Sequence, residues 1–133
     1  MAGGESSRLF VYNGGFLTQS RVRRILQLSG YRLRLGLPGP GDTVGVWGNS
    51  PTAHRGLSVA EKRNAPVLRV EDAFLRSLHP GRAGEPPIGL HLDRRGVHFD
   101  ASVPSDLETL LATAPLDDTA LLDRARDAIA RMQ

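Results

Sequence analysis

Two adjacent carboxylates directly follow a short apolar run, and they form the first group of residues that could do chemistry. The run is PVLRV at residues 66–70, the carboxylates are Glu71 and Asp72, and Arg76 follows them. A carboxylate at a strand end can accept hydrogen bonds from sugar hydroxyls or act as a base, and the arginine can neutralise it or hold an acidic substrate. A plainer interpretation is that Asp72 caps a short helix at residues 73–77, while Glu71 and Arg76 form an exposed pair of little energetic value. The residue types alone leave both interpretations open.

Two further turns carry residues suited to ligand binding. Asn13 and Gly14 follow one β-prone run. Trp47 and Gly48 end a second run, shortly before Pro51. Because ligands bind beyond the carboxyl ends of strands in an open parallel sheet, we expect these turns and the acidic pair to line one cleft. Glycine allows close approach of a ligand, and the following helix offers N–H groups to an anion, although Ser-Pro-Thr is also an ordinary helix entry with a serine N-cap.

Other kinds of reactive site find little support in the sequence. The four histidines, at positions 54, 79, 91 and 98, have no metal-ligand spacing, so we expect no metal site. The chain has no cysteine, and none of its serines lies in a G-x-S-x-G elbow. We therefore expect this chain to bind no metal or cofactor of its own.

Alternating β-prone runs and helical patterns predict the elements that position these residues. We expect strands at residues 7–12, 31–35, 43–47 and 66–70, and helices that begin at Thr18 and Thr52 and end at Ser29 and Arg63. Such alternation with short links is typical of an α/β protein with a parallel, Rossmann-like sheet flanked by helices. Residues 31–35 alternate apolar and charged side chains, which favours an edge strand, whereas the continuous apolar run at 43–47 favours an interior strand.

The C-terminal third has a different pattern. A loop rich in proline and glycine spans residues 78–87, and residues 88–92 and 97–100 flank a D-R-R-G turn that predicts a β-hairpin. Two helices should follow, and the last carries one apolar stripe. The stripe consists of Leu121, Leu122, Ala125, Ala128, Ile129 and Met132. We expect residues 1–6 to be disordered and residues 7–133 to form a single domain.

Composition limits the classes of function. No apolar run approaches the roughly 20 residues of a membrane-spanning helix, so we expect a cytoplasmic protein. The formal charge is +3, and Lys62 is the single lysine among 17 basic residues. Such arginine usage often reflects genomic base composition. Nucleic-acid binding would rest on the high pI of about 10.2 alone, because only 5% of residues are aromatic, and we do not expect it.

Several segments together resemble a known family. They contain the patterns W-G-x-x-P, R-V-E-D-x-F-L-R-S and D-x-x-G-V-H-F-D-A-x-x-P-S-D-L-E, in this order, within residues 10–111. This succession resembles the opening portion of the Gram-negative capsule polysaccharide biosynthesis and export family. Its members are retaining β-Kdo transferases with two Rossmann-like halves (the GT-B fold), which use CMP-Kdo to build the linker between capsule chains and lipid.

The resemblance implies roles for particular positions. Trp47, Gly48 and Pro51 match the first cleft motif, and the second motif spans residues 71–77, from Glu71 through Arg76 to Ser77. The third motif matches Asp100, Pro104, Ser105 and Asp106. Ala73 stands where the family usually has glycine, and alanine would be strained there if the position needs a positive φ.

The resemblance also implies partners. The donor-binding segments of the family lie further along than this chain extends, which implies the acceptor-side half of a CMP-Kdo-dependent enzyme, inactive without a second half. A glycolipid acceptor and a peripheral association with the inner face of the inner membrane are implied as well. The alternative is a noncatalytic remnant or an interaction module with the same fold.

Overall fold

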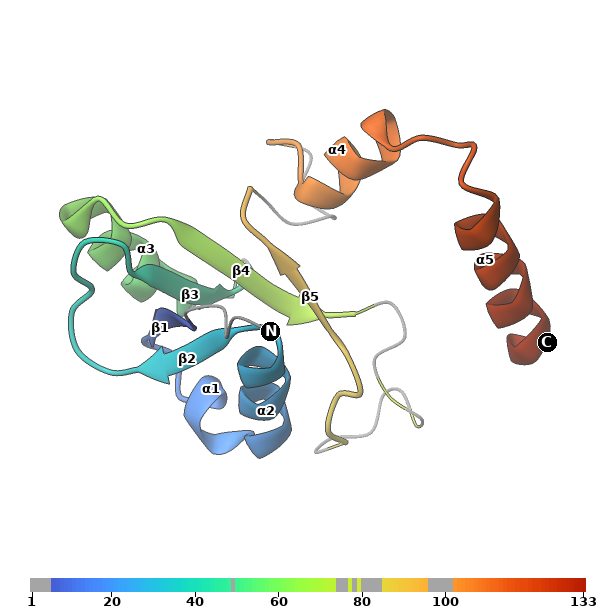
Figure 1. Ribbon diagram of the computed structural model, residues 1–133. Helices are drawn as coiled ribbons and strands as arrows, with labels where there is room; N and C mark the ends of the chain where they lie inside the picture. Colours follow the sequence, from blue (N-terminus) through green and yellow to red (C-terminus); the bar gives the residue numbers. More distant parts are fainter. Residues whose placement is uncertain (1–5, 49, 74–76, 78, 80–84, 96–101) are drawn as a thin grey trace.

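The computed structural model describes residues 6–48, 50–73, 77, 79, 85–95 and 102–133. Figure 1 shows one twisted sheet with helices on both faces, and two further helices that stand apart from it. The sheet has five strands in the order β2-β1-β3-β4-β5. Their bounds are β1 (Ser7–Val11), β2 (Tyr31–Arg34), β3 (Thr43–Trp47), β4 (Val67–Asp72) and β5 (Leu90–Asp93).

The first four strands are parallel, as the alternation of strands and helices predicts. β1 pairs with β2 and β3, and β3 pairs with β4. β2 lies at the edge and exposes Arg32 and Arg34, whereas Val44 and Val46 of β3 are fully buried. The predicted edge and interior strands are therefore both confirmed.

The fifth strand differs from the expected arrangement. β5 pairs antiparallel with β4, so it extends the main sheet. The second strand of the predicted hairpin, residues 97–100, lies outside the described residues. The pairing makes the sheet mixed, with an antiparallel strand at one edge, which is common in α/β folds.

The helix after β1 is broken where the sequence predicted one continuous helix. α1 (Gly15–Thr18) and α2 (Ser20–Leu28) are separated by Gln19, whose backbone is extended. Thr18 is therefore the last residue of α1 and does not cap the longer helix. The predicted end of the helix at Ser29 is followed by Gly30, which has a φ of +91°, a conformation that glycine adopts without strain.

Each face of the sheet carries its own apolar core. On one face α1 and α2 cover Leu9, Val11, Leu68 and Val70. On the other face α3 (Ala53–Arg63) covers Val44 and Val46. Gly56 of α3 has no side chain because a Cβ there would lie 2.7 Å from Cγ1 of Val46. This helix consequently packs close to the strand.

The two C-terminal helices occur where the sequence predicts them. α4 (Asp106–Thr113) begins with a capping box in which Ser105 accepts from the backbone N–H of Glu108 and the Glu108 side chain accepts from that of Ser105. α5 (Thr119–Met132) stands apart from the sheet in Figure 1 and has no buried residue. Its predicted apolar stripe is exposed. Within the described residues, no helix is both long and apolar enough to cross a membrane.

Candidate functional site

A small pocket opens at the carboxyl ends of β1 and β3, where the sequence predicted a cleft. Its volume is about 190 Å³. The described residues that line it are Asn13, Gly15, Phe16, Gln19, Trp47, Ser50 and Thr52. Asn13 and Trp47 were expected there, whereas Phe16, Gln19 and Thr52 were not. The break between α1 and α2 brings Gln19 to the pocket, and no residue pattern indicated that break.

Two contacts hold the pocket walls together. Trp47 and Phe16 meet edge to face, with their ring centroids 5.8 Å apart. The side-chain amide of Asn13 donates to the hydroxyl of Thr52, which joins the turn after β1 to the start of α3. Oδ1 of Asn13 is buried, and the described residues offer it no hydrogen-bond partner. Aromatic rings beside amides and hydroxyls are suited to a sugar, which has apolar ring faces and many hydroxyls.

Two hydrogen bonds to β4 hold the turn after β3 in place. Gly48 has a φ of +45° and donates its N–H to the carbonyl of Val70 at 2.9 Å. The guanidinium of Arg69 donates to the carbonyl of Gly48, also at 2.9 Å. Gly48 therefore serves the turn itself, because few other residues adopt a positive φ without strain.

The start of α3 differs from the predicted N-cap. The helix begins at Ala53 with Thr52 as its N-cap residue, and no side chain makes a capping hydrogen bond. The hydroxyls of Ser50 and Thr52 lie 3.3 Å apart. Pro51 is exposed, and its carbonyl lies 2.6 Å from Nδ1 of His54. The predicted serine cap is wrong, because the serine hydroxyl lies beside that of Thr52 and does not reach a helix N–H.

The two carboxylates that the sequence places together lie on opposite faces of the sheet. Both belong to β4, whereas the sequence predicted them to follow it. Since side chains alternate along a strand, Asp72 shares the face of Leu68 and Val70, which is the face covered by α1 and α2. Trp47 packs on this face too. Glu71 has the opposite face and is only 5% exposed. Asp72 is therefore the carboxylate that shares a face with the aromatic wall of the pocket.

Glu71 belongs to a group of ionisable side chains on its own face, which we call the β4–β5 polar cluster. The cluster consists of Arg69, Glu71, His91 and Asp93. In the antiparallel register Arg69 is opposite Asp93, and Glu71 is opposite His91. Nε2 of His91 lies 3.6 Å from Oδ2 of Asp93. The opposite charges of Arg69 and Asp93 at facing positions stabilise the pairing of β5 with β4.

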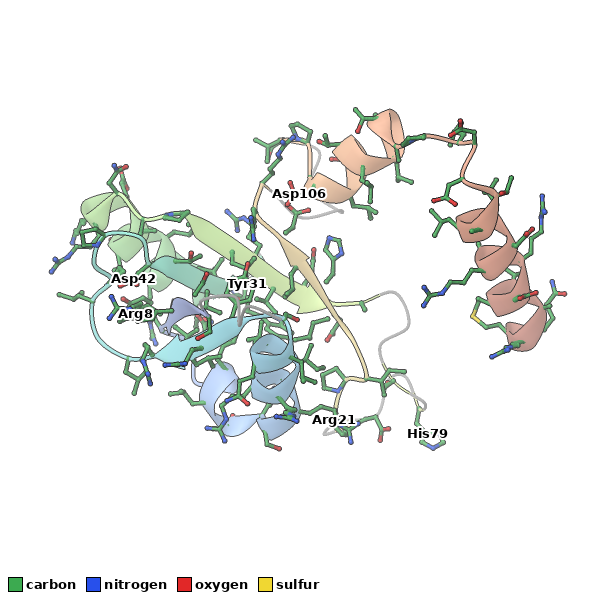
Figure 2. The ribbon with its side chains drawn as sticks, in the orientation of Figure 1. Arg8, Arg21, Tyr31, Asp42, His79 and Asp106 are labelled. Atoms are coloured by element: carbon green, nitrogen blue, oxygen red, sulfur yellow. The ribbon has the colours of Figure 1, made fainter. Side chains whose placement is uncertain are left out.

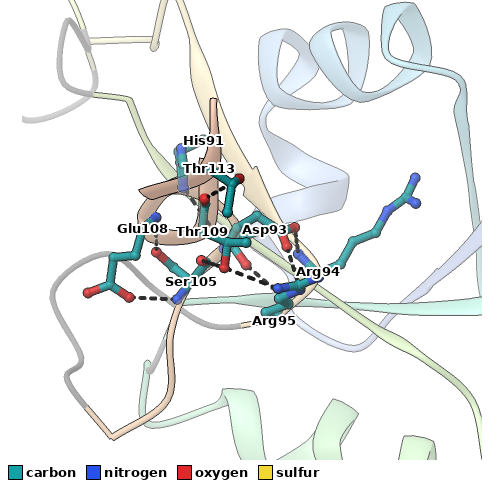
Figure 3. A network of polar contacts seen from close by, with 9 residues as sticks. His91, Asp93, Arg94, Arg95, Ser105, Glu108, Thr109 and Thr113 are labelled. Atoms are coloured by element: carbon teal, nitrogen blue, oxygen red, sulfur yellow. Dashed lines mark hydrogen bonds and ion pairs between the residues drawn. The ribbon is translucent and has the colours of Figure 1, made fainter. Parts of the chain in front are cut away.

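Asp93 also connects the sheet to α4, as Figure 3 shows. It is fully buried and accepts hydrogen bonds from the backbone N–H groups of Arg95 and Asp106, both at 2.7 Å. Asp106 in turn accepts from the backbone N–H of Arg94 at 2.9 Å and pairs with Arg95 at 3.1 Å. In the sequence Asp93 is recognisable only as part of the D-R-R-G turn, because the capping box pattern S-D-L-E predicts the start of α4 and not its contact with Asp93.

The remaining predicted residues are distributed as follows. Gly14 is exposed at the start of α1, and Ser77 is half-buried. Arg76 and Asp100 lie outside the described residues. Ala73 does not have a positive φ, so alanine in place of the family's usual glycine causes no backbone strain. In the part of the chain that the structure describes, no three His, Asp or Glu side chains gather as a metal site would require.

Tyr12 and Arg94 have shifted pKa values, and neither residue lines the pocket. Burial raises the pKa of Tyr12, whose hydroxyl donates to the carbonyl of Gly36 at 2.6 Å, and Arg63 partly opposes this rise. A hydrogen bond to the hydroxyl of Tyr31 raises the pKa of Arg94. The Tyr12–Gly36 hydrogen bond connects the segments that follow β1 and β2, and the Arg94–Tyr31 hydrogen bond connects the segment after β5 to β2.

Comparison with known proteins gives consistent matches. Residues 42–130 match the family described as capsule polysaccharide biosynthesis protein. Capsule polysaccharide modification protein LipA from Neisseria meningitidis serogroup A is 36% identical over 88 residues, which are 66% of this chain and 12% of LipA. Lipopolysaccharide-processing protein LpsZ from Rhizobium meliloti is 44% identical over 68 residues, which are 50% of this chain and 16% of LpsZ.

A solved structure matches most of the chain. KpsC from Thermosulfurimonas dismutans, a beta Kdo 2,4 transferase, has a TM-score of 0.78 and 28% identity to this chain. The match covers 95% of this chain and 39% of KpsC. The chain thus corresponds to a minor part of each of these proteins.

Proposed function

The chain belongs to the capsule polysaccharide biosynthesis family, and we propose that it forms the acceptor-side half of a β-Kdo glycosyltransferase that uses CMP-Kdo as donor. The observation that carries this proposal is the pocket at the carboxyl ends of β1 and β3, in a fold similar to that of KpsC. Ligands bind at this edge in open α/β sheets. The second half of the cleft, which would hold the donor, would come from further protein.

Asp72 and Glu71 take different roles in this proposal. Asp72 shares a face with Trp47 and is half-buried, so it is the candidate to accept a proton or a hydrogen bond from an acceptor hydroxyl. Glu71 is buried opposite His91 and acts as a positioning residue that keeps β4 in register. The acceptor side of the cleft would consist of Asn13, Gly14, Trp47, Gly48, Pro51, Arg76 and Ser77. The acceptor would be a glycolipid.

The test measures Kdo transfer from CMP-Kdo to a glycolipid acceptor by the complete enzyme that contains this chain or pairs with it. Asp72→Asn should lower kcat at least a hundredfold with little change in stability, because general acid–base groups contribute about 10²–10⁴-fold. Glu71→Gln should mainly lower stability, and Asp123→Asn on exposed α5 should change neither. Full activity of Asp72→Asn would remove the proposed role of this carboxylate. Absence of transfer by the unsubstituted enzyme would overturn the proposed function.

A noncatalytic interaction module is the alternative, and the exposed stripe of α5 favours it. Leu121 is 59% exposed, Ile129 53% and Met132 62%. Such a stripe usually packs on a partner. In this case the chain would bind a protein partner through α5 and show no affinity for CMP-Kdo or acceptor, alone or in complex. Isothermal titration with each compound distinguishes the two functions.

A further inference from the structure

The first third of the chain has an unusual distribution of charge. Between Ser6 and Gly41 the sequence contains no Lys, Asp or Glu, and it contains six arginines. They are Arg8, Arg21, Arg23, Arg24, Arg32 and Arg34. Because the whole chain has a net charge of only +3, the positive charge is concentrated in this segment. Such asymmetry points to an anionic partner.

The folded structure leaves most of these arginines exposed. Arg8 pairs with the buried carboxylate of Asp42 at 2.8 Å, and Figure 2 shows them side by side. The other five are exposed, and none of them has an ion pair or side-chain hydrogen bond with any described residue. The charge of α2 is therefore available to a partner.

Three of the arginines share the solvent side of α2 with apolar side chains. Arg21, Arg24 and Leu28 follow the spacing i, i+3, i+7, so they form one stripe, and Arg23 flanks it. Leu28 is 72% exposed, and Leu17 of neighbouring α1 is 40% exposed. We call these five residues the α2 basic surface. Its opposite side, with Val22 and Leu26, is buried on the sheet.

We propose that the α2 basic surface docks on an anionic lipid bilayer. Arginines bind lipid phosphates, and exposed leucines can enter the boundary between head groups and acyl chains. Nucleic acid is a poorer fit, because single-stranded binding needs exposed aromatic rings, and the four rings of this segment are buried or partly buried. This docking does not depend on the transferase chemistry.

Docking in this orientation would bring the candidate pocket close to the bilayer. Gln19 lines both the pocket and a neighbouring cavity of about 430 Å³, which Arg21 also lines. The cavity is bounded on its other side by residues 85–87, and Figure 2 shows Arg21 beside this segment. A ligand anchored in the bilayer could therefore reach the cavity and the pocket from the docked surface.

The test is co-sedimentation of the full chain with vesicles of phosphatidylcholine alone or mixed with phosphatidylglycerol. The variant R21Q/R23Q/R24Q should bind the mixed vesicles at least tenfold more weakly, since each arginine near the surface contributes about fivefold. The control R124Q/R126Q/R131Q removes the same charge from α5, where Arg126 already pairs with Asp123, and should bind as the unsubstituted chain does. Circular dichroism should show that both variants remain folded, because all six arginines are exposed.

A second variant tests the apolar contribution. Leu28→Ser should weaken binding severalfold at a salt concentration that screens the arginines. If the two arginine variants lost vesicle binding equally, binding would depend only on the net charge of the chain, and the proposal would be overturned. Binding to single-stranded DNA that depends on the α2 arginines, without binding to vesicles, would assign the surface to nucleic acid and overturn it as well.

Discussion

The two faces of the sheet differ most where β3 and β4 end. On the face of α1 and α2, a pocket is lined by aromatic rings, amides and hydroxyls, and the Oδ1 of Asn13 has no partner among the described residues. On the opposite face, the β4–β5 polar cluster is buried, and Asp93 accepts two short hydrogen bonds. Buried and hydrogen-bonded charges maintain structure, whereas partly open polar groups can bind a ligand.

This difference separates two carboxylates that are neighbours in the chain. Glu71 lies in the polar cluster and Asp72 lies on the pocket face, although the sequence offers them as equivalent candidates. Substitutions on the cluster face should therefore lower the free energy of unfolding, while substitutions on the pocket face should mainly lower affinity. The following predictions test this comparison, beginning with the largest effect.

Removal of Asp93 should have the largest effect on stability. Asp93→Ala leaves the N–H groups of Arg95 and Asp106 without their acceptor and weakens the connection between β5 and α4. We expect a loss of about 3 kcal/mol or more, as for other broken buried charge networks. Urea unfolding followed by circular dichroism measures the loss, and Asp123→Ala on exposed α5 is the control. A loss below about 1 kcal/mol would show that the cluster does not maintain the structure.

Gly56→Ala tests the close packing of α3 on the cluster face. The new Cβ would lie 2.7 Å from Cγ1 of Val46, so helix and strand must move apart. We expect a loss of about 1–3 kcal/mol, despite the higher helix propensity of alanine. Gly14→Ala is the matched control, because its Cβ would meet nothing within 4 Å. If both variants were equally stable in urea, α3 would have to pack more loosely than the structure shows.

Asn13→Ala should have the smallest effect on stability. It removes the contact with Thr52 but also removes a buried oxygen that lacks a partner, so the two changes partly cancel. We expect a loss of no more than about 1 kcal/mol in urea unfolding. Acceptor affinity, measured on the complete enzyme, should fall about tenfold. A large loss of stability with unchanged affinity would place Asn13 among the structural residues and reverse its part in the comparison.

Local patterns predicted much of the fold correctly. The alternating residues of β2 and the continuous apolar residues of β3 indicated an edge strand and an interior strand, because burial on one or two faces leaves that signature in the sequence. The helical spacings at α3, α4 and α5 were also sufficient. The parallel order predicted one cleft at the carboxyl ends of β1, β3 and β4. The pocket lies at those of β1 and β3, and neither Glu71 nor Asp72 is among the described residues that line it.

Three features could not be predicted from local patterns. The break at Gln19 depends on how α1 and α2 pack on the sheet. β5 pairs with β4, which is distant in sequence from the D-R-R-G turn of the predicted hairpin. The role of Asp93 depends on backbone groups of a segment more than ten residues away. Each feature results from contacts between distant segments, which propensity and periodicity do not report.

The sequence by itself determined the family, the order of strands and helices, and the set of residues available for chemistry, since these are carried by residue types and short-range spacing. Only the tertiary structure decided which of these residues act together. It placed Asp72 on the face of Trp47 and buried Glu71 opposite His91. The physical reason is that a strand directs successive side chains to opposite faces, and the helices and strands packed on each face then determine whether a carboxylate is buried or open to a ligand.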